Sequence, residues 1–296
     1  MSDATVTTDV DSVLNQPFEA IDGSHAFDIA TNVNREGSNK FSKVLSTKWQ
    51  GDVAVPHGGY MLSVSLEALS RFYDGIHPHP VSATCYYAKP ARTGKRVDID
   101  IHELRRGRQF STAIARMSQN GQLITHVVAT FGDLSQTKGL ATVIMDSPNK
   151  VVHPRECIAS RSGGVIARQC HLLSDPREKP VSKDRAERRH CIRFKDGRAP
   201  CVKSLAFFAD AFTPPTWKYG MAFLGGKVWT PTVELNIQFR KAVINPGWLK
   251  QHIYTRFLLN GRFEVDMDIF DEQDELVCVA RQMGITLSHE KQTSKL

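Results

Sequence analysis

The sequence predicts an α+β protein made of two similar units, each with one helix followed by an antiparallel sheet. A helical stripe of apolar residues precedes four strand-like runs, and the same order occurs again in the second half of the chain. The alternation of apolar and polar residues in these runs is typical of strands with one face in the core. An Asn-Gly pair, which favours a tight hairpin, joins two runs in each half, at 120–121 and 260–261.

In the first half, the helix follows two adjacent glycines. Leu62, Leu66 and Leu69 are spaced four and three residues apart, which places them on one helical face. The spacing predicts a helix over residues 59–72. The four strand-like runs that follow it cover residues 81–88, 96–104, 109–118 and 123–131.

In the second half, a short apolar helix is predicted over residues 204–212, and it stops before Pro214-Pro215 because proline cannot continue a helix. Four strand-like runs follow again. They cover residues 233–239, 250–259, 262–270 and 276–287.

The composition is that of an ordinary globular protein. The chain has 296 residues, of which 41% are hydrophobic and 23% charged, and its net charge is +7. These values exclude collagenous, coiled-coil and fully disordered chains. No apolar run approaches the ~20 residues that a membrane span needs. The positive charge suits an anionic ligand, but acidic strands such as 263–270 argue against nucleic acid.

The six cysteines have no CxxC spacing, so a reducing compartment is expected rather than a disulfide scaffold. No set of His, Cys, Asp and Glu has the spacing of a metal site. No glycine-rich phosphate loop is present either. The sequence therefore predicts a protein without a metal or a cofactor.

The pattern divides the chain into five parts. The first unit covers residues 38–134 and the second, which carries the expected catalytic residues, covers 187–288. The remaining parts are an N-terminal tail and lead-in over 1–37, an inter-domain connection over 135–186 and a C-terminal tail over 289–296.

Periodicity fades in the connection, and positive charge gathers there. Residues 146–200 contain 13 basic and 7 acidic side chains. A solvated linker accounts for this composition, and so does a cationic rim for a phosphate-bearing ligand. Both interpretations remain open at this point.

Both ends of the chain bear on its location. Residues 1–16 are polar and acidic, so neither a secretory signal nor a mitochondrial transit peptide is expected. The last three residues, Ser294, Lys295 and Leu296, form the address that a peroxisomal import receptor recognises. We therefore expect a peroxisomal location, where many metabolites are acyl-CoA thioesters.

Several short motifs in both halves point to one family. They are PHGGY at 56–60, YAKPARTG at 87–94, RRGRQF at 105–110, QNGQL at 119–123, SLAFFAD at 204–210, TVEL at 232–235 and VARQ at 279–282. In this order and spacing, the chain resembles the type II acyl-CoA thioesterases, which are built from two hotdog units in tandem. A hotdog unit is a central helix wrapped by an antiparallel sheet. The resemblance covers residues 38–288.

The resemblance implies three catalytic residues, Asp210, Thr232 and Gln282. In the family, such residues orient and deprotonate a water that attacks the thioester carbonyl, which gives the free acid and CoA without a cofactor. The residues themselves allow this role: an unpaired carboxylate in the apolar segment 205–212 would be costly to bury, and burial would raise its pKa towards that of a useful general base. Each residue also has a plain structural alternative: a helix-terminal or surface acid, an ordinary strand threonine, and an amide at the sheet edge.

The first half offers an internal comparison. Counting along the strands, Pro80 takes the place of Thr232 and Ala129 the place of Gln282. The first half is therefore not expected to hold a second complete site. Its helix still carries Glu67 near the position of Asp210. Glu67 is therefore either the alternative base or an acid on a solvated helix face.

The segment His57, Gly58, Gly59 and Tyr60 is predicted to bind substrate. Glycines at a helix start let a ligand approach the backbone, and free N–H groups there favour negative charge on a thioester oxygen. A tight turn before a helix is the structural alternative. His57 is either an acid–base residue or a structural histidine.

Three functions fit these observations. The first is hydrolysis of an acyl-CoA thioester. The second is another step on an acyl thioester, such as hydration, dehydration or product release in a specialised biosynthetic pathway, because one fold hosts several reactions. The third is a thioester-binding module without chemistry. A homo-oligomer is compatible with each of them.

Overall fold

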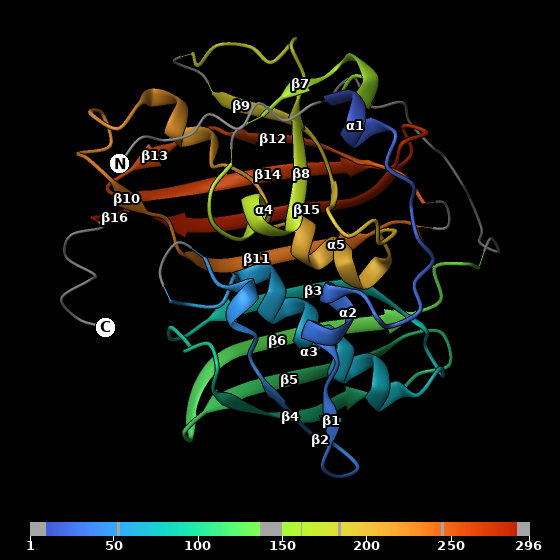
Figure 1. Ribbon diagram of the computed structural model, residues 1–296. Coiled ribbons are helices and arrows are strands. Elements are labelled where there is room, and N and C mark those ends of the chain that lie inside the picture. Colours follow the sequence, from blue (N-terminus) through green and yellow to red (C-terminus); the bar gives the residue numbers. More distant parts are fainter. Residues whose placement is uncertain are drawn as a thin grey trace.

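One continuous antiparallel sheet runs through both halves of the chain in the computed structural model (Figure 1). The structure describes residues 10–51, 54–136, 150–160, 162–182, 185–243 and 246–288. Within them the sheet has 14 strands, and its order is β1-β2-β4-β5-β6-β3-β11-β15-β14-β12-β9-β8-β7, with β13 paired to β14. The strands of the first half are β1 (Asn34–Arg35), β2 (Lys40–Val44), β3 (His79–Tyr87), β4 (Arg96–Arg105), β5 (Ser111–Gln119) and β6 (Gln122–Gly132).

The second half supplies the remaining strands. They are β7 (Ile158–Ala159), β8 (Cys170–Ser174), β9 (Ala186–Phe194), β11 (Thr232–Phe239), β12 (Leu249–Thr255), β13 (Leu258–Leu259), β14 (Arg262–Phe270) and β15 (Leu276–Ile285). A separate two-stranded pair joins β10 (Val228–Trp229) to β16 (Leu287–Ser288). The four strand-like runs predicted in each half are confirmed.

The helices lie on one face of this sheet (Figure 1). They are α1 (Val10–Leu14), α2 (Ala26–Thr31), α3 (Gly58–Tyr73), α4 (Gly164–Gln169) and α5 (Val202–Phe208), with 3₁₀ turns η1 (Thr47–Trp49), η2 (Pro154–Glu156) and η3 (Pro215–Tyr219). Helix α3 agrees with the predicted helix to within a residue at each end. Helix α5 ends four residues before the predicted helix, because the chain turns at Ala209.

The two units are joined edge to edge by β3 and β11, and both strands carry the same irregularity. The register of β3 against β6 shifts between Pro80 and Ser82, and that of β11 against β15 shifts between Thr232 and Glu234. A bulge bends a strand and changes the direction of its side chains. The two bulges therefore mark the same position in the two units. Thr232 therefore corresponds to Pro80, as the counting along the strands predicts.

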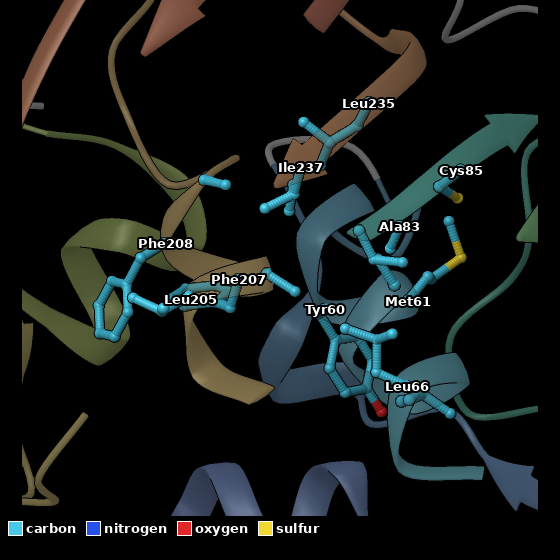
Figure 2. Packing of buried hydrophobic residues seen from close by; sticks show 14 of the residues in the cluster. Tyr60, Met61, Leu66, Ala83, Cys85, Leu205, Phe207, Phe208, Leu235 and Ile237 are labelled. Carbon is cyan, nitrogen blue, oxygen red and sulfur yellow. The ribbon is translucent and has the colours of Figure 1, made fainter. Parts of the chain in front are cut away.

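The core is shared by the two halves. Met61 of α3, Ala83 and Cys85 of β3, Phe207 of α5 and Ile237 of β11 are all buried in one cluster (Figure 2). Burial of apolar side chains from both units in one core stabilises the fold as a whole. The double hotdog predicted from the sequence is confirmed.

Part of the predicted connection belongs to the second unit. Strand β8 pairs with β9, and β7 pairs with β8, so residues 158–174 extend the sheet. The prediction of residues 135–186 as an inter-domain connection is therefore wrong for this stretch. Strands of two and five residues are too short to show a clear alternation in the sequence. Residues 137–149 of the connection lie outside the described residues.

Three arginines of this region have partners inside the fold. Arg198 pairs with Asp28 at 2.7 Å, and Arg188 pairs with Glu178 at 3.2 Å. Arg193 donates to the carbonyl oxygen of Gln16 at 2.8 Å. These partners are structural, so they do not support the cationic rim that the sequence left open.

The N-terminal lead-in is also part of the packed structure. Phe27 of α2 is fully buried in the main core, and Val13 of α1 packs in a second, smaller apolar cluster with Cys191 and Trp248. The prediction of residues 1–37 as a tail is thus wrong for the described part of it. No helix in the described ranges is both long and apolar enough to cross a membrane.

Candidate active site

Asp210 lies just beyond the end of α5, where the chain leaves the helix. Its backbone N–H still donates to the carbonyl oxygen of Phe207 at 3.1 Å, so the turn holds the residue in place. The residue is only 9% exposed. A carboxylate buried to this extent needs hydrogen-bond donors, and the structure supplies them from three different elements.

Thr232 and Gln282 provide two of these donors. The Thr232 hydroxyl donates to Asp210 Oδ1 at 3.1 Å, and Gln282 Nε2 donates to the same oxygen at 3.0 Å. Gln282 Nε2 also donates to the Thr232 hydroxyl oxygen. The three residues predicted as catalytic are therefore brought into one hydrogen-bonded cluster. Gln282 Oε1 is buried and has no hydrogen-bond partner within the described structure, so it can accept a hydrogen bond from a bound molecule.

The third donor comes from the first unit. The Gly59 N–H, at the start of α3, donates to Asp210 Oδ2 at 2.7 Å. A Cβ at Gly59 would stand 2.7 Å from the Ala206 carbonyl oxygen, so only glycine allows α3 and α5 to approach this closely. The sequence predicted the Gly59 N–H as a donor to substrate. That prediction is corrected, because Asp210 occupies this donor.

His57 and Tyr60 have different surroundings. His57 Nδ1 lies 3.4 Å from Asp210 Oδ2, and its ring packs 5.2 Å from that of Phe207. Tyr60 points away from this cluster: its hydroxyl donates to the Ala30 carbonyl oxygen at 3.0 Å and accepts from the Ser46 N–H at 3.1 Å. Burial raises the pKa of Tyr60 to about 12. Tyr60 therefore supports the fold, and its prediction as a substrate-binding residue is corrected.

A cavity of about 570 Å³ opens beside the cluster. Its volume is within the range of small-molecule sites. Asp210, Thr232, Gln282, His57 and Gly58 all line it. The walls are mainly apolar and include Met61, Val165, Ile166, Phe212, Trp217, Met221, Trp229 and Phe263, while Lys227 adds one positive charge.

Glu67, the alternative base, is placed elsewhere. Lys203 Nζ lies 2.8 Å from one of its carboxylate oxygens and Arg71 Nε lies 2.8 Å from the other. Glu67 does not line the cavity beside Asp210. Two cations thus hold this carboxylate, and the structure does not bring it together with the other predicted residues.

Reasoning from the sequence missed much of the cavity wall. Trp217 and Trp229 come from the segment between α5 and β11, which has no periodic pattern that could place its side chains. Tyr87 also lines the cavity, although in the sequence it is only part of a motif. Within the described part of the chain, no group of three or more His, Cys, Asp or Glu side chains is placed to hold a metal ion.

Family models match both halves of the chain. Residues 46–132 match the acyl-CoA thioesterase N-terminal domain, and residues 152–286 match the acyl-CoA thioesterase C-terminal domain. Among curated proteins, the chain is similar to the thioesterase-like protein TwmA of Talaromyces wortmannii. The two are 23% identical, over 82% of this chain and 86% of the relative.

Solved structures share the fold. A protein from Thermobifida fusca described as a thioesterase II has a TM-score of 0.75 at 23% identity, with 89% of this chain and 98% of that chain covered. A hot dog fold protein from Alicyclobacillus acidocaldarius has a TM-score of 0.73 at 19% identity, with 90% and 99% covered. The acyl-CoA thioesterase II TesB2 of Mycobacterium marinum has a TM-score of 0.68 at 16% identity, with 90% and 100% covered.

Proposed function

Because the chain belongs to the acyl-CoA thioesterase family and is an enzyme of the thioester hydrolase class, we propose that it hydrolyses an acyl-CoA to the free acid and CoA at the Asp210 cluster. The observation that carries this proposal is the hydrogen-bonded group of Asp210, Thr232 and Gln282 beside an apolar cavity. The cavity can receive an acyl chain, and Lys227 at its wall suits an anionic substrate such as CoA.

The proposed reaction uses water as the nucleophile. Asp210 Oδ2 accepts one backbone N–H, which leaves a lone pair of this oxygen for a water proton. Gln282 Oε1 accepts the second hydrogen of the same water and orients it. The Thr232 hydroxyl fixes the carboxylate through Oδ1. The three residues would thus hold one water molecule so that a lone pair of its oxygen is directed at the thioester carbonyl carbon.

The bonds change in two steps. The water oxygen bonds to the carbonyl carbon while its proton passes to Asp210, and the C=O electron pair moves onto the carbonyl oxygen. That pair then returns, the C–S bond breaks, and the thiolate takes the proton from Asp210. The products are one acid and one thiol, and the carboxylate is restored.

A panel of acyl-CoA thioesters of increasing chain length tests this proposal. Release of free thiol, followed with a thiol reagent, should occur for at least one member of the panel and depend on Asp210. Product masses should show the acyl group as the free acid. A hydrated or dehydrated thioester with no thiol release would instead show that the enzyme performs another step on its substrate.

The location of the protein also stays a proposal. Ser294, Lys295 and Leu296 predict import into the peroxisome, and they lie outside the described residues. An N-terminal fluorescent fusion should localise to peroxisomes, and the same fusion without these three residues should not. Equal cytosolic signal from both fusions would disprove the peroxisomal location.

A further inference from the structure

Tyr87 places an unused hydroxyl group beside the candidate active site. It is the last residue of β3, and its ring lines the same cavity as Asp210 and Gln282. The hydroxyl oxygen is buried, and no described residue forms a hydrogen bond of good geometry with it, although the Cys85 thiol, a weak partner, lies nearby. Leaving a buried hydroxyl unpaired is unfavourable. A phenylalanine would fill the same space without that cost. The hydroxyl is therefore expected to form a hydrogen bond with a bound molecule.

The hydroxyl and the carboxylate flank the same point of the backbone. A Cβ placed on Gly58 would stand 3.2 Å from the Tyr87 hydroxyl oxygen and 2.8 Å from Asp210 Oδ2. Glycine at this position leaves the space that brings the phenol and the base close together. Tyr87 is therefore held at the N-terminus of α3, where the attacked carbonyl group must also lie if Asp210 is the base.

The surroundings keep the proton on the phenol. Burial raises the pKa of Tyr87 well above its ordinary value, and the neighbouring Cys85 thiol and Asp210 carboxylate raise it further. The group is thus a hydrogen-bond donor throughout the range in which enzymes are assayed. It does not act as a second base.

The carbonyl oxygen of the substrate needs donors that are not already engaged. The Gly59 N–H is bound to Asp210, so it is not available. The Gly58 N–H, in the first turn of α3, has no partner within the described ranges. We propose that the Tyr87 hydroxyl, together with the Gly58 N–H, donates to the thioester carbonyl oxygen and stabilises the oxyanion formed when water attacks. This inference rests on the proposed hydrolysis at Asp210.

The role involves no transfer of the phenolic proton. As the water oxygen bonds to the carbonyl carbon, the C=O electron pair moves onto the oxygen that Tyr87 and Gly58 face. The hydrogen bonds to that oxygen strengthen as its charge grows, which lowers the barrier. When the C–S bond breaks, the pair returns to the carbonyl and Tyr87 keeps its proton.

Tyr87→Phe is the variant that isolates the hydroxyl. It should lower kcat for the best acyl-CoA by about 100- to 1000-fold, which is the effect of removing one oxyanion donor, and leave KM within about threefold. The loss should be the same from pH 6 to pH 9. Tyr86→Phe is the matched control, because Tyr86 is the adjacent residue and is 47% exposed. It should hydrolyse at the parent rate.

Two further measurements separate the outcomes. Binding of an S-alkyl-CoA thioether, which lacks the carbonyl oxygen, should be equal in the parent and in Tyr87→Phe and shows that the site is folded. If Tyr87→Phe binds the thioether and hydrolyses within about twofold of the parent rate while Asp210→Asn is inactive, the role of Tyr87 is disproved and the proposed function stands. A rise in KM of Tyr87→Phe without a fall in kcat would also disprove the role of Tyr87. If the parent releases no thiol from any acyl-CoA, the proposed function itself fails.

Discussion

The two ends of the contact between α3 and α5 hold a carboxylate in equivalent places. At one end, Asp210 accepts the N–H of Gly59, the second residue of α3. At the other end, Glu67 pairs with the ammonium group of Lys203, the second residue of α5. Asp210 is held by a backbone donor and lines a cavity, whereas Glu67 is held by cations and does not. The two units thus place a carboxylate at equivalent ends of the helix contact, as a cavity-lining group in one and as a member of an ion pair in the other.

The strands next to the helices show the same difference. Gln282 pairs with Leu235 in the sheet, and Ala129 pairs with Ala83 at the equivalent point. The bulge that follows Thr232 in one unit follows Pro80 in the other, so the equivalent position of the first unit has no hydroxyl group. A carboxylate becomes useful only where the sheet also supplies a hydroxyl and an amide. At the equivalent positions of the first unit, Pro80 and Ala129 supply neither.

The largest effect is expected from removing the base of the second unit. Asp210→Asn keeps the size of the side chain but cannot accept the water proton, so kcat should fall by about 10²–10⁴-fold. Glu67→Gln should leave kcat unchanged within about twofold. Steady-state rates of thiol release, with circular dichroism to verify folding, compare the two variants. An inactive Glu67→Gln beside an active Asp210→Asn would place the site in the first unit.

Removing the partners of Asp210 should have smaller effects that do not add. Gln282→Ala takes away the group that orients water, and Thr232→Ala takes away one donor to the carboxylate. Each should lower kcat less than Asp210→Asn does, and the double variant should lose less than the product of the two losses, because the residues act as a unit. A double-mutant cycle on kcat measures the coupling. Fully additive losses would show that Gln282 and Thr232 act independently.

Much of this architecture could be predicted because it follows from patterns along the chain. The alternation in each strand and the repeat of helix and sheet predict the fold. The same counting predicts that Gln282 and Thr232 have no polar counterparts in the first unit, which the register confirms. That Asp210, Thr232 and Gln282 are close together comes from the resemblance to a family, and their hydrogen bonds agree with it.

The rest depends on contacts between segments that lie far apart in the sequence. Nothing near Tyr60 indicates that its hydroxyl bonds to Ala30, and nothing near Gly59 indicates that its N–H meets Asp210, 151 residues away. The unpaired hydroxyl of Tyr87 becomes visible only when the atoms around it are known. Local periodicity reports which face of an element is buried, but not which partner covers it.

The close approach at Gly59 should be specific to the functional end of the helix contact. In Gly59→Ala, the new Cβ would meet the Ala206 and Phe207 carbonyl oxygens at 2.7 and 2.9 Å. Backbone atoms cannot move aside cheaply, so we expect a loss of about 1–3 kcal/mol in the free energy of unfolding together with a fall in kcat. Gly37→Ala is the control, since its Cβ would have only Lys40 Cβ at 3.8 Å. Urea unfolding compares the two variants, and equal stabilities would contradict a tight contact.

Strands β9 and β2, which take equivalent places in the two units, should also differ in their effect on acid sensitivity. His190 on β9 is 1% exposed, and burial lowers its pKa to about 4, while Glu178 opposes this shift and Arg188 and Lys218 add to it. The equivalent strand of the first unit, β2, contains no histidine.

Because the pKa of His190 is lower in the folded than in the unfolded chain, its contribution to stability is complete above pH 6.5 and decreases as the pH falls towards 4. Between pH 7.5 and pH 5, this residue should cost the parent on the order of 2 kcal/mol of unfolding free energy. His190→Gln should lose correspondingly less over the same interval. The exposed His102→Gln should behave as the parent does. Urea unfolding at the two pH values gives the free energy of unfolding of all three proteins. Equal losses of this free energy in the parent and in His190→Gln would show that burial of this histidine does not make the second unit acid-sensitive.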